Sequence, residues 1–193
     1  ITYYQGKIMS QHSHVSQQFI NKIRAGVLGA NDGIVSTASI VVGVAGATSS
    51  IEAIAISGLA AVIGGAISMA LGEYVSVASQ RDTEKSYMQS QDSHEENDED
   101  FSSPTAAAVT SFFSFLIGSL LPLLAILFSP EASRFVITCI ATVISLSITG
   151  AVSAKLGNAS IARAVIRLVI GGILALSITY GIGAYVSHLG VLT

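Results

Sequence analysis

Two carboxylates and a thioether stand inside long apolar stretches in the first half of this sequence. Asp32 lies in the apolar stretch 25–47, and Met69 and Glu73 lie in the stretch 51–79. An ionisable side chain within a membrane helix costs roughly 2.5–3.5 kcal/mol on insertion scales, so such residues mark ion and proton pathways. Carboxylates bind divalent cations, and a thioether favours softer transition metals over Mg2+ or Ca2+. Asp32, Met69 and Glu73 are therefore candidate ligands for Fe2+ or Mn2+.

The spacing of these residues predicts that the two carboxylates meet at one depth. Asp32 follows Arg24, and Glu73 precedes Arg81, by the same interval, so each carboxylate lies about 12 Å from the basic end of its helix. If the two helices are antiparallel neighbours, the carboxylates share one level. Met69 lies one turn from Glu73 on the same face and reaches about 6 Å deeper.

Small and polar residues extend the pattern along both stretches. One helical face of the first stretch carries Asp32, Ser36, Ser39 and Gly43. We expect this stripe to line a path for an ion. Glycines predict close approach of neighbouring helices, because they allow backbones to touch; they are Gly29 and Gly33 in the first stretch and Gly58, Gly65 and Gly72 in the second.

Weaker candidate ligands lie in polar segments. His94, Glu95 and Glu96 belong to an acidic segment that could concentrate divalent cations loosely, although a solvated linker is the favoured interpretation. His12 and His14 are expected to be solvated as well. The acidic segment lacks the second histidine of the H-E-x-x-H motif, and the chain shows no nucleophile motif and no phosphate-binding loop. The sequence therefore predicts a protein that is not an enzyme and has no cofactor.

The composition excludes an ordinary soluble domain. Of the 193 residues, 51% are hydrophobic and 11% are charged, and the mean hydropathy is +0.66. The single cysteine, Cys139, excludes a disulfide framework and a cysteine metal cluster. Nothing in the sequence indicates a nucleic-acid partner.

The apolar runs predict an all-α integral membrane protein, a single domain with five transmembrane helices. The expected spans are about 23–47, 51–80, 105–128, 134–154 and 161–188. Residues 1–20 form a tail, and residues 81–103 form a short acidic linker. All Lys and Arg residues except Arg134 fall on one side of this arrangement, so the positive-inside rule places the N-terminus and the linker in the cytoplasm and the C-terminus outside.

The sequence resembles the vacuolar iron transporter family over nearly its whole length. Four blocks carry the resemblance in order: GANDGIVSTASIVVGVAGA at 29–47, SMALGEYVSVASQRDTEK at 68–85, PTAAAVTSFFSFLIGSLLPL at 104–123 and ARAVIRLVIGGILALSITYGIGA at 162–184. The resemblance implies a five-helix protomer that forms a C2 homodimer, with a cation path at the dimer axis between the first and second helices. It also implies Asp32 of the GAND motif and Met69 as ligands in that path, with Glu73 of the GEY motif as the next candidate.

Two features depart from the family pattern. Ala25 stands where some members carry another acid, so a ligand at the entrance is missing. Only residues 86–103 stand where iron-transporting members have a long, glutamate-rich cytoplasmic domain. The chain resembles the short, nodulin-like members in this respect.

Together these features predict a transporter that exports Fe2+, Mn2+ or both from the cytosol in exchange for protons, with Glu73 as the proton carrier because it lies one turn from Met69. A metal channel without proton coupling and a non-transporting membrane scaffold are the alternatives. The expected partners are a second copy of the chain, metal ions, protons and the lipid bilayer. The short tails favour a bacterial inner membrane, with a vacuolar or other organelle membrane as the second choice.

Overall fold

The computed structural model describes residues 2–90 and 103–189, with side chains for 21–87 and 103–189. Within these ranges the secondary structure is helical and contains no strand, as the sequence predicts. Five long helices and one short 3-10 helix follow one another: α1 (Thr2–Ala47), α2 (Ile51–Ser90), α3 (Pro104–Phe128), η2 (Glu131–Ser133), α4 (Arg134–Leu156) and α5 (Ile161–His188).

The five long helices are each long and apolar enough to cross a membrane, which confirms the expected number of spans. The apolar spans are Asn21–Ala47, Ile51–Tyr87, Pro104–Phe128, Glu131–Leu156 and Ile161–His188. Helix α1 has 46 residues and α2 has 40, or about 69 and 60 Å at 1.5 Å per residue. Because the hydrocarbon core is about 30 Å thick, both helices continue well beyond a bilayer.

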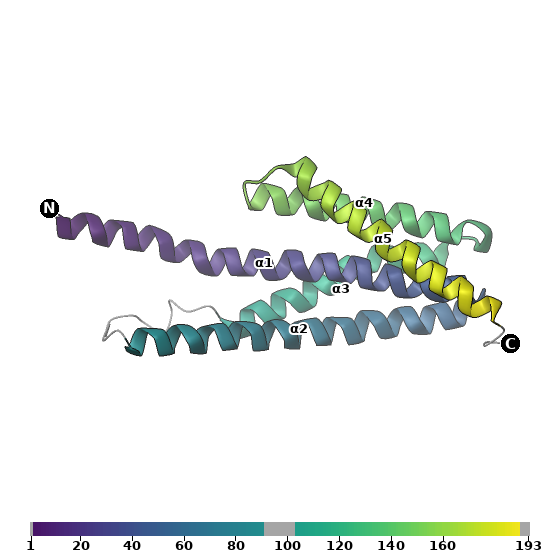
Figure 1. The fold of residues 1–193 in the computed structure, drawn as a ribbon, viewed down its shortest axis with the longest axis horizontal. Coiled ribbons are helices and arrows are strands. Elements are labelled where there is room, and N and C mark those ends of the chain that lie inside the picture. Colours follow the sequence, from purple (N-terminus) through teal and green to yellow (C-terminus); the bar gives the residue numbers. More distant parts are fainter. Residues whose placement is uncertain (1, 91–102, 190–193) are drawn as a thin grey trace.

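The helices alternate in direction, so the connections fall at two ends of the bundle. The N-terminal part of α1 and the C-terminal end of α2 project at the end that also holds the α4–α5 connection (Figure 1). The α1–α2 and α3–α4 connections and the end of α5 lie at the opposite end. This arrangement is the one that the charge pattern requires. The direction in which the bundle faces across the membrane stays a prediction.

Helix α1 is the centre of the bundle, and α2 is at its edge. Helix α1 contacts all four other long helices, whereas the main contacts of α2 are with α1 and α3 (Figure 1). A cluster of buried apolar side chains at the α1–α2 end of the bundle joins these elements; it consists of Ala38, Val41, Val42, Ile54, Val62, Leu123, Ile126 and Leu176. This cluster fixes α2 against α1 and α3 and so determines which face of α2 meets the Asp32 side of α1.

Glycines let α1 and α3 touch backbone to backbone. A Cβ at Gly29 would lie 2.6 Å from the Ser111 carbonyl oxygen, and one at Gly33 would collide with the carbonyl oxygen of Phe115. The hydroxyl of Ser119 also donates to the Gly33 carbonyl at 3.1 Å. The prediction of close packing from the glycine pair is therefore confirmed, and its partner is α3.

Candidate metal site

A groove between α1 and α2 brings the three candidate ligands together. Asp32 lines it from α1, and Met69 and Glu73 line it from α2. The groove has a volume of about 460 Å³. The structure thus places the ligands that the spacing predicted on the walls of one space.

Asp32 lies in the interior of α1, far from either end of the helix, so it does not cap the helix. The Ser36 hydroxyl, one turn further along, donates to Oδ1 of Asp32 at 2.6 Å. Ser36 also lines the groove. The serine therefore orients the carboxylate within the groove, and the predicted polar stripe begins as expected.

The stripe does not continue along the groove. Ser39 is buried, and its hydroxyl oxygen has no partner among the described atoms. Gly43 faces α5: a Cβ there would lie 3.2 Å from the carbonyl oxygen of Thr179. The prediction that the stripe lines a path through Gly43 is wrong for this chain, because α5 crosses α1 at that level and covers it (Figure 1).

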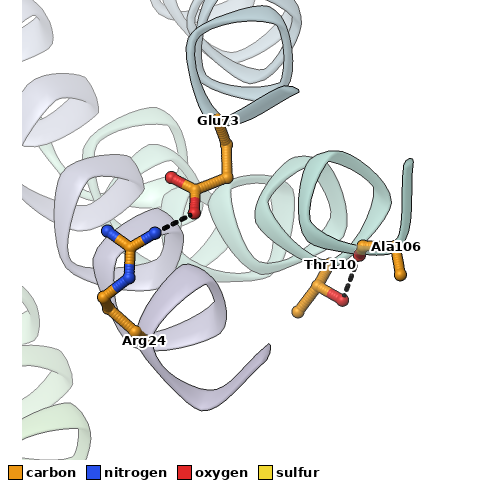
Figure 2. Close-up of polar contacts among 4 residues, drawn as sticks. All are labelled: Arg24, Glu73, Ala106 and Thr110. Carbon is orange, nitrogen blue, oxygen red and sulfur yellow. Dashed lines mark hydrogen bonds and ion pairs between the residues drawn. The ribbon is translucent and has the colours of Figure 1, made fainter. Parts of the chain in front are cut away.

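Glu73 is almost completely buried, and it is paired with a cation. Its side chain is 5% exposed, and its Oε1 accepts a hydrogen bond from Nη2 of Arg24 at 2.7 Å. Figure 2 shows the guanidinium of α1 reaching across to the carboxylate of α2. A buried carboxylate needs such a partner, since an unpaired buried charge is strongly destabilising.

The functional residue that sequence reasoning missed is Arg24. The sequence pattern placed it only as the basic end of the first span, two helical turns before Asp32. The signal was present in the spacing: Arg24, Leu28 and Asp32 are four residues apart, so they follow one side of the helix. The estimate of depth took no account of the length of the arginine side chain, which spans the gap to α2.

Met69 lies one turn before Glu73 on α2 and is partly exposed to the groove. Small residues keep its surroundings open. Positions that a Cβ would occupy at Gly64 and Gly72 have no heavy atom within 4 Å, whereas at Gly65 a Cβ would collide with the ring of Phe115. The glycine series on α2 is therefore divided, with one side packed against α3 and the other open beside the groove.

One chain supplies two carboxylates and one thioether to this groove. Among the described side chains, no group of three or more His, Cys, Asp or Glu residues gathers elsewhere. Ala25, where some relatives carry an acid, is fully buried against Val77 and Ala107. His94, Glu95 and Glu96 lie outside the described residues, as do the side chains of His12 and His14.

The sequence of the chain matches the profile of the VIT family over residues 23–102 and 87–184. The protein belongs to the VIT family. The match confirms the resemblance to vacuolar iron transporters, and it includes all three groove residues and Arg24. The VIT-family relatives cover most of the chain, so the likeness extends beyond the motifs at the groove.

Two plant relatives illustrate the extent of this likeness. Vacuolar iron transporter homolog 1 of Oryza sativa subsp. japonica is 46% identical over 167 residues, which cover 83% of this chain and 72% of the relative. Vacuolar iron transporter homolog 4 of Arabidopsis thaliana is 39% identical over 170 residues, 88% of this chain and 86% of the relative. The VIT-family chain described here therefore has nearly the full extent of these homologs.

Proposed function

We propose that this protein exports a divalent transition metal, Fe2+ or Mn2+, from the cytosol. The observation that carries the proposal is the groove in which Asp32, Met69 and Glu73 converge between α1 and α2. Two carboxylates and a thioether form a mixed set of ligands that suits these metals better than Mg2+. The names of the plant relatives, which are vacuolar iron transporter homologs, support iron as a substrate.

The transport path lies at the axis of a C2 homodimer. A single groove offers fewer ligands than a divalent ion takes, and it is open on the side of Gly64 and Gly72. A second copy that packs on this open side would close the groove. Twofold symmetry would then bring two copies of each ligand together and double the ligand set. These features support the dimer that the family resemblance implied.

Protons replace the metal at the carboxylates when it leaves, so transport is an antiport. A metal ion binds only to a deprotonated carboxylate, and its binding therefore releases a proton from a group that was protonated. Asp32 and Glu73 are the titratable groups of the groove, and Arg24 is the charged group that faces them. The vacuolar membrane is the proposed location, since the names of the relatives give the bacterial preference no support.

Metal flux into liposomes that contain the purified protein tests the proposal. Asp32→Asn and Met69→Ala should each abolish or greatly reduce Fe2+ and Mn2+ flux, because each removes a ligand from the groove. Matched controls lie on the same helix and outside the groove: Asp82→Asn for the carboxylate and Leu71→Ala for the thioether, both at exposed positions. These variants should transport normally.

The same assay separates the alternative functions. A scaffold would show no metal flux in the wild type. A channel would show flux that ignores a proton gradient. Normal flux in Asp32→Asn or in Met69→Ala would remove that residue from the path.

A further inference from the structure

The ion pair between Arg24 and Glu73 joins a buried ligand to a mobile cation. The Glu73 side chain is 5% exposed, whereas the Arg24 side chain is 47% exposed. The guanidinium therefore reaches into the groove from a position at its edge. A long side chain that is half exposed can leave the carboxylate and turn toward solvent or lipid headgroups, with its charge still solvated.

Arg24 stands at one end of the groove. Leu28 and Asp32 line the groove from α1, and Arg24 lies one turn before Leu28 toward the projecting N-terminal part of the helix. In the proposed orientation this end faces the cytosol. A metal ion that enters from that side meets the guanidinium before it reaches Glu73 or Asp32.

The neighbouring helix leaves this contact undisturbed. Thr110 of α3 lies near the pair, but its hydroxyl donates to the Ala106 carbonyl of its own helix at 2.7 Å (Figure 2). In the described structure, the printed partner of the Glu73 carboxylate is thus Arg24. The pair can open without breaking the hydrogen bond of Thr110.

We propose that Arg24 is a tethered cation that occupies Glu73 while no metal is bound, and that an entering divalent metal ion displaces it. This inference rests on the proposed function, because it concerns the same groove. Arg24 is a positioning and selectivity residue and does not bind the metal. It holds the buried carboxylate in its charged form and directs it into the groove. A monovalent cation that fails to displace the guanidinium does not reach Glu73.

Displacement makes metal affinity depend on how often the guanidinium occupies its place. Apparent affinity falls in proportion to the fraction of molecules that can bind. If Arg24 covers Glu73 about nine-tenths of the time, its removal should tighten metal binding about tenfold. A purely structural role predicts the opposite sign, because loss of the arginine would leave Glu73 poorly oriented.

Binding of Mn2+ to the purified full chain in detergent, measured by the electron paramagnetic resonance signal of free Mn2+, tests this sign. Arg24→Gln should bind Mn2+ about tenfold more tightly than the wild type. Arg24→Lys keeps the charge and should stay within about twofold of the wild type by the same argument. Lys22→Gln removes the same charge from an exposed position on α1 and should leave the affinity unchanged. In a Glu73→Gln background, Arg24→Gln should have no effect.

Thermal unfolding and size-exclusion chromatography verify that each variant is folded, and Arg24→Met replaces Arg24→Gln if that variant fails. Affinity that is unchanged or weaker in a folded Arg24→Gln or Arg24→Met protein would overturn the inference and leave the proposed function intact. An equal gain of affinity in the Glu73→Gln background would overturn it too. A wild type with neither Mn2+ binding nor flux would reject the proposed function, and the inference with it.

Discussion

Arg24 of α1 and Glu73 of α2 are joined by a hydrogen-bonded ion pair of 2.7 Å at the groove that Asp32 and Met69 also line. This pair gives the two carboxylates of the groove different partners. Glu73 faces a guanidinium, and Asp32 accepts a hydrogen bond from a neutral hydroxyl, that of Ser36, at 2.6 Å. The two acids therefore differ in what balances their charge when the metal is absent, although the sequence presents them as equivalent.

Substitution of Met69 should affect the choice of metal. A thioether contributes little to the binding of Mg2+ but stabilises softer ions. In Met69→Ala, residual Mn2+ flux should be inhibited by Mg2+ at roughly tenfold lower concentration than in the wild type, a typical effect of altering a metal's surroundings. Competition of Mg2+ with Mn2+ flux in liposomes measures this, and Leu71→Ala, at an exposed position, is the control. Unaltered Mg2+ competition would show that the thioether does not face the metal.

Helices and ligands were predictable because local sequence determines them. Apolar length fixed the five spans, and helical spacing put Met69 and Glu73 on one face of α2. The contacts between helices were not predictable in the same way. Gly43 looked like part of the ion path until α5 was found to cover it, and Arg24 looked like a membrane anchor until its side chain was found on Glu73. Both outcomes depend on which helices meet, and the periodicity of one helix does not contain that information.

The contact between α1 and α3 should be intolerant of a single methyl group. Gly33→Ala would force its Cβ against the Phe115 carbonyl, so the helices must separate. Overpacking of this kind costs about 1–3 kcal/mol, and we expect a lower midpoint of thermal unfolding in detergent. Gly171→Ala on α5 is the matched control, because its Cβ would meet nothing within 4 Å. An unfolding midpoint for Gly33→Ala equal to that of the control would contradict the close approach.

Deletion of residues 91–100 should alter transport only slightly. This acidic segment, which contains His94, Glu95 and Glu96, lies outside the described residues. Its negative charge can raise the local concentration of cations, so its loss should raise the KM for Mn2+ on the order of twofold at low salt. The difference should disappear at high ionic strength, where such attraction is screened. Loss of transport in a folded, inserted deletion variant would instead assign the segment an essential role.

Proton coupling should distinguish the two carboxylates of the groove. After the metal leaves, Arg24 can balance the charge of Glu73, whereas Asp32 has only the Ser36 hydroxyl and so takes up a proton. This reasoning moves the proton from Glu73, where the sequence had placed it, to Asp32. Glu73→Gln should therefore lower metal flux and keep the wild-type ratio of protons to metal ions, recorded together as lumenal pH and metal in liposomes.

Arg24→Gln supplies the complementary test of the same coupling. It removes the cation that balances Glu73, so a proton must take its place, and the number of protons exchanged per metal ion should rise above that of the wild type. Glu52→Gln, at an exposed position at the far end of α2, is the control and should leave the ratio unchanged. A ratio that falls in Glu73→Gln would return the transported proton to Glu73. A ratio that stays constant in Arg24→Gln would show that Glu73 needs no cation when the metal is absent.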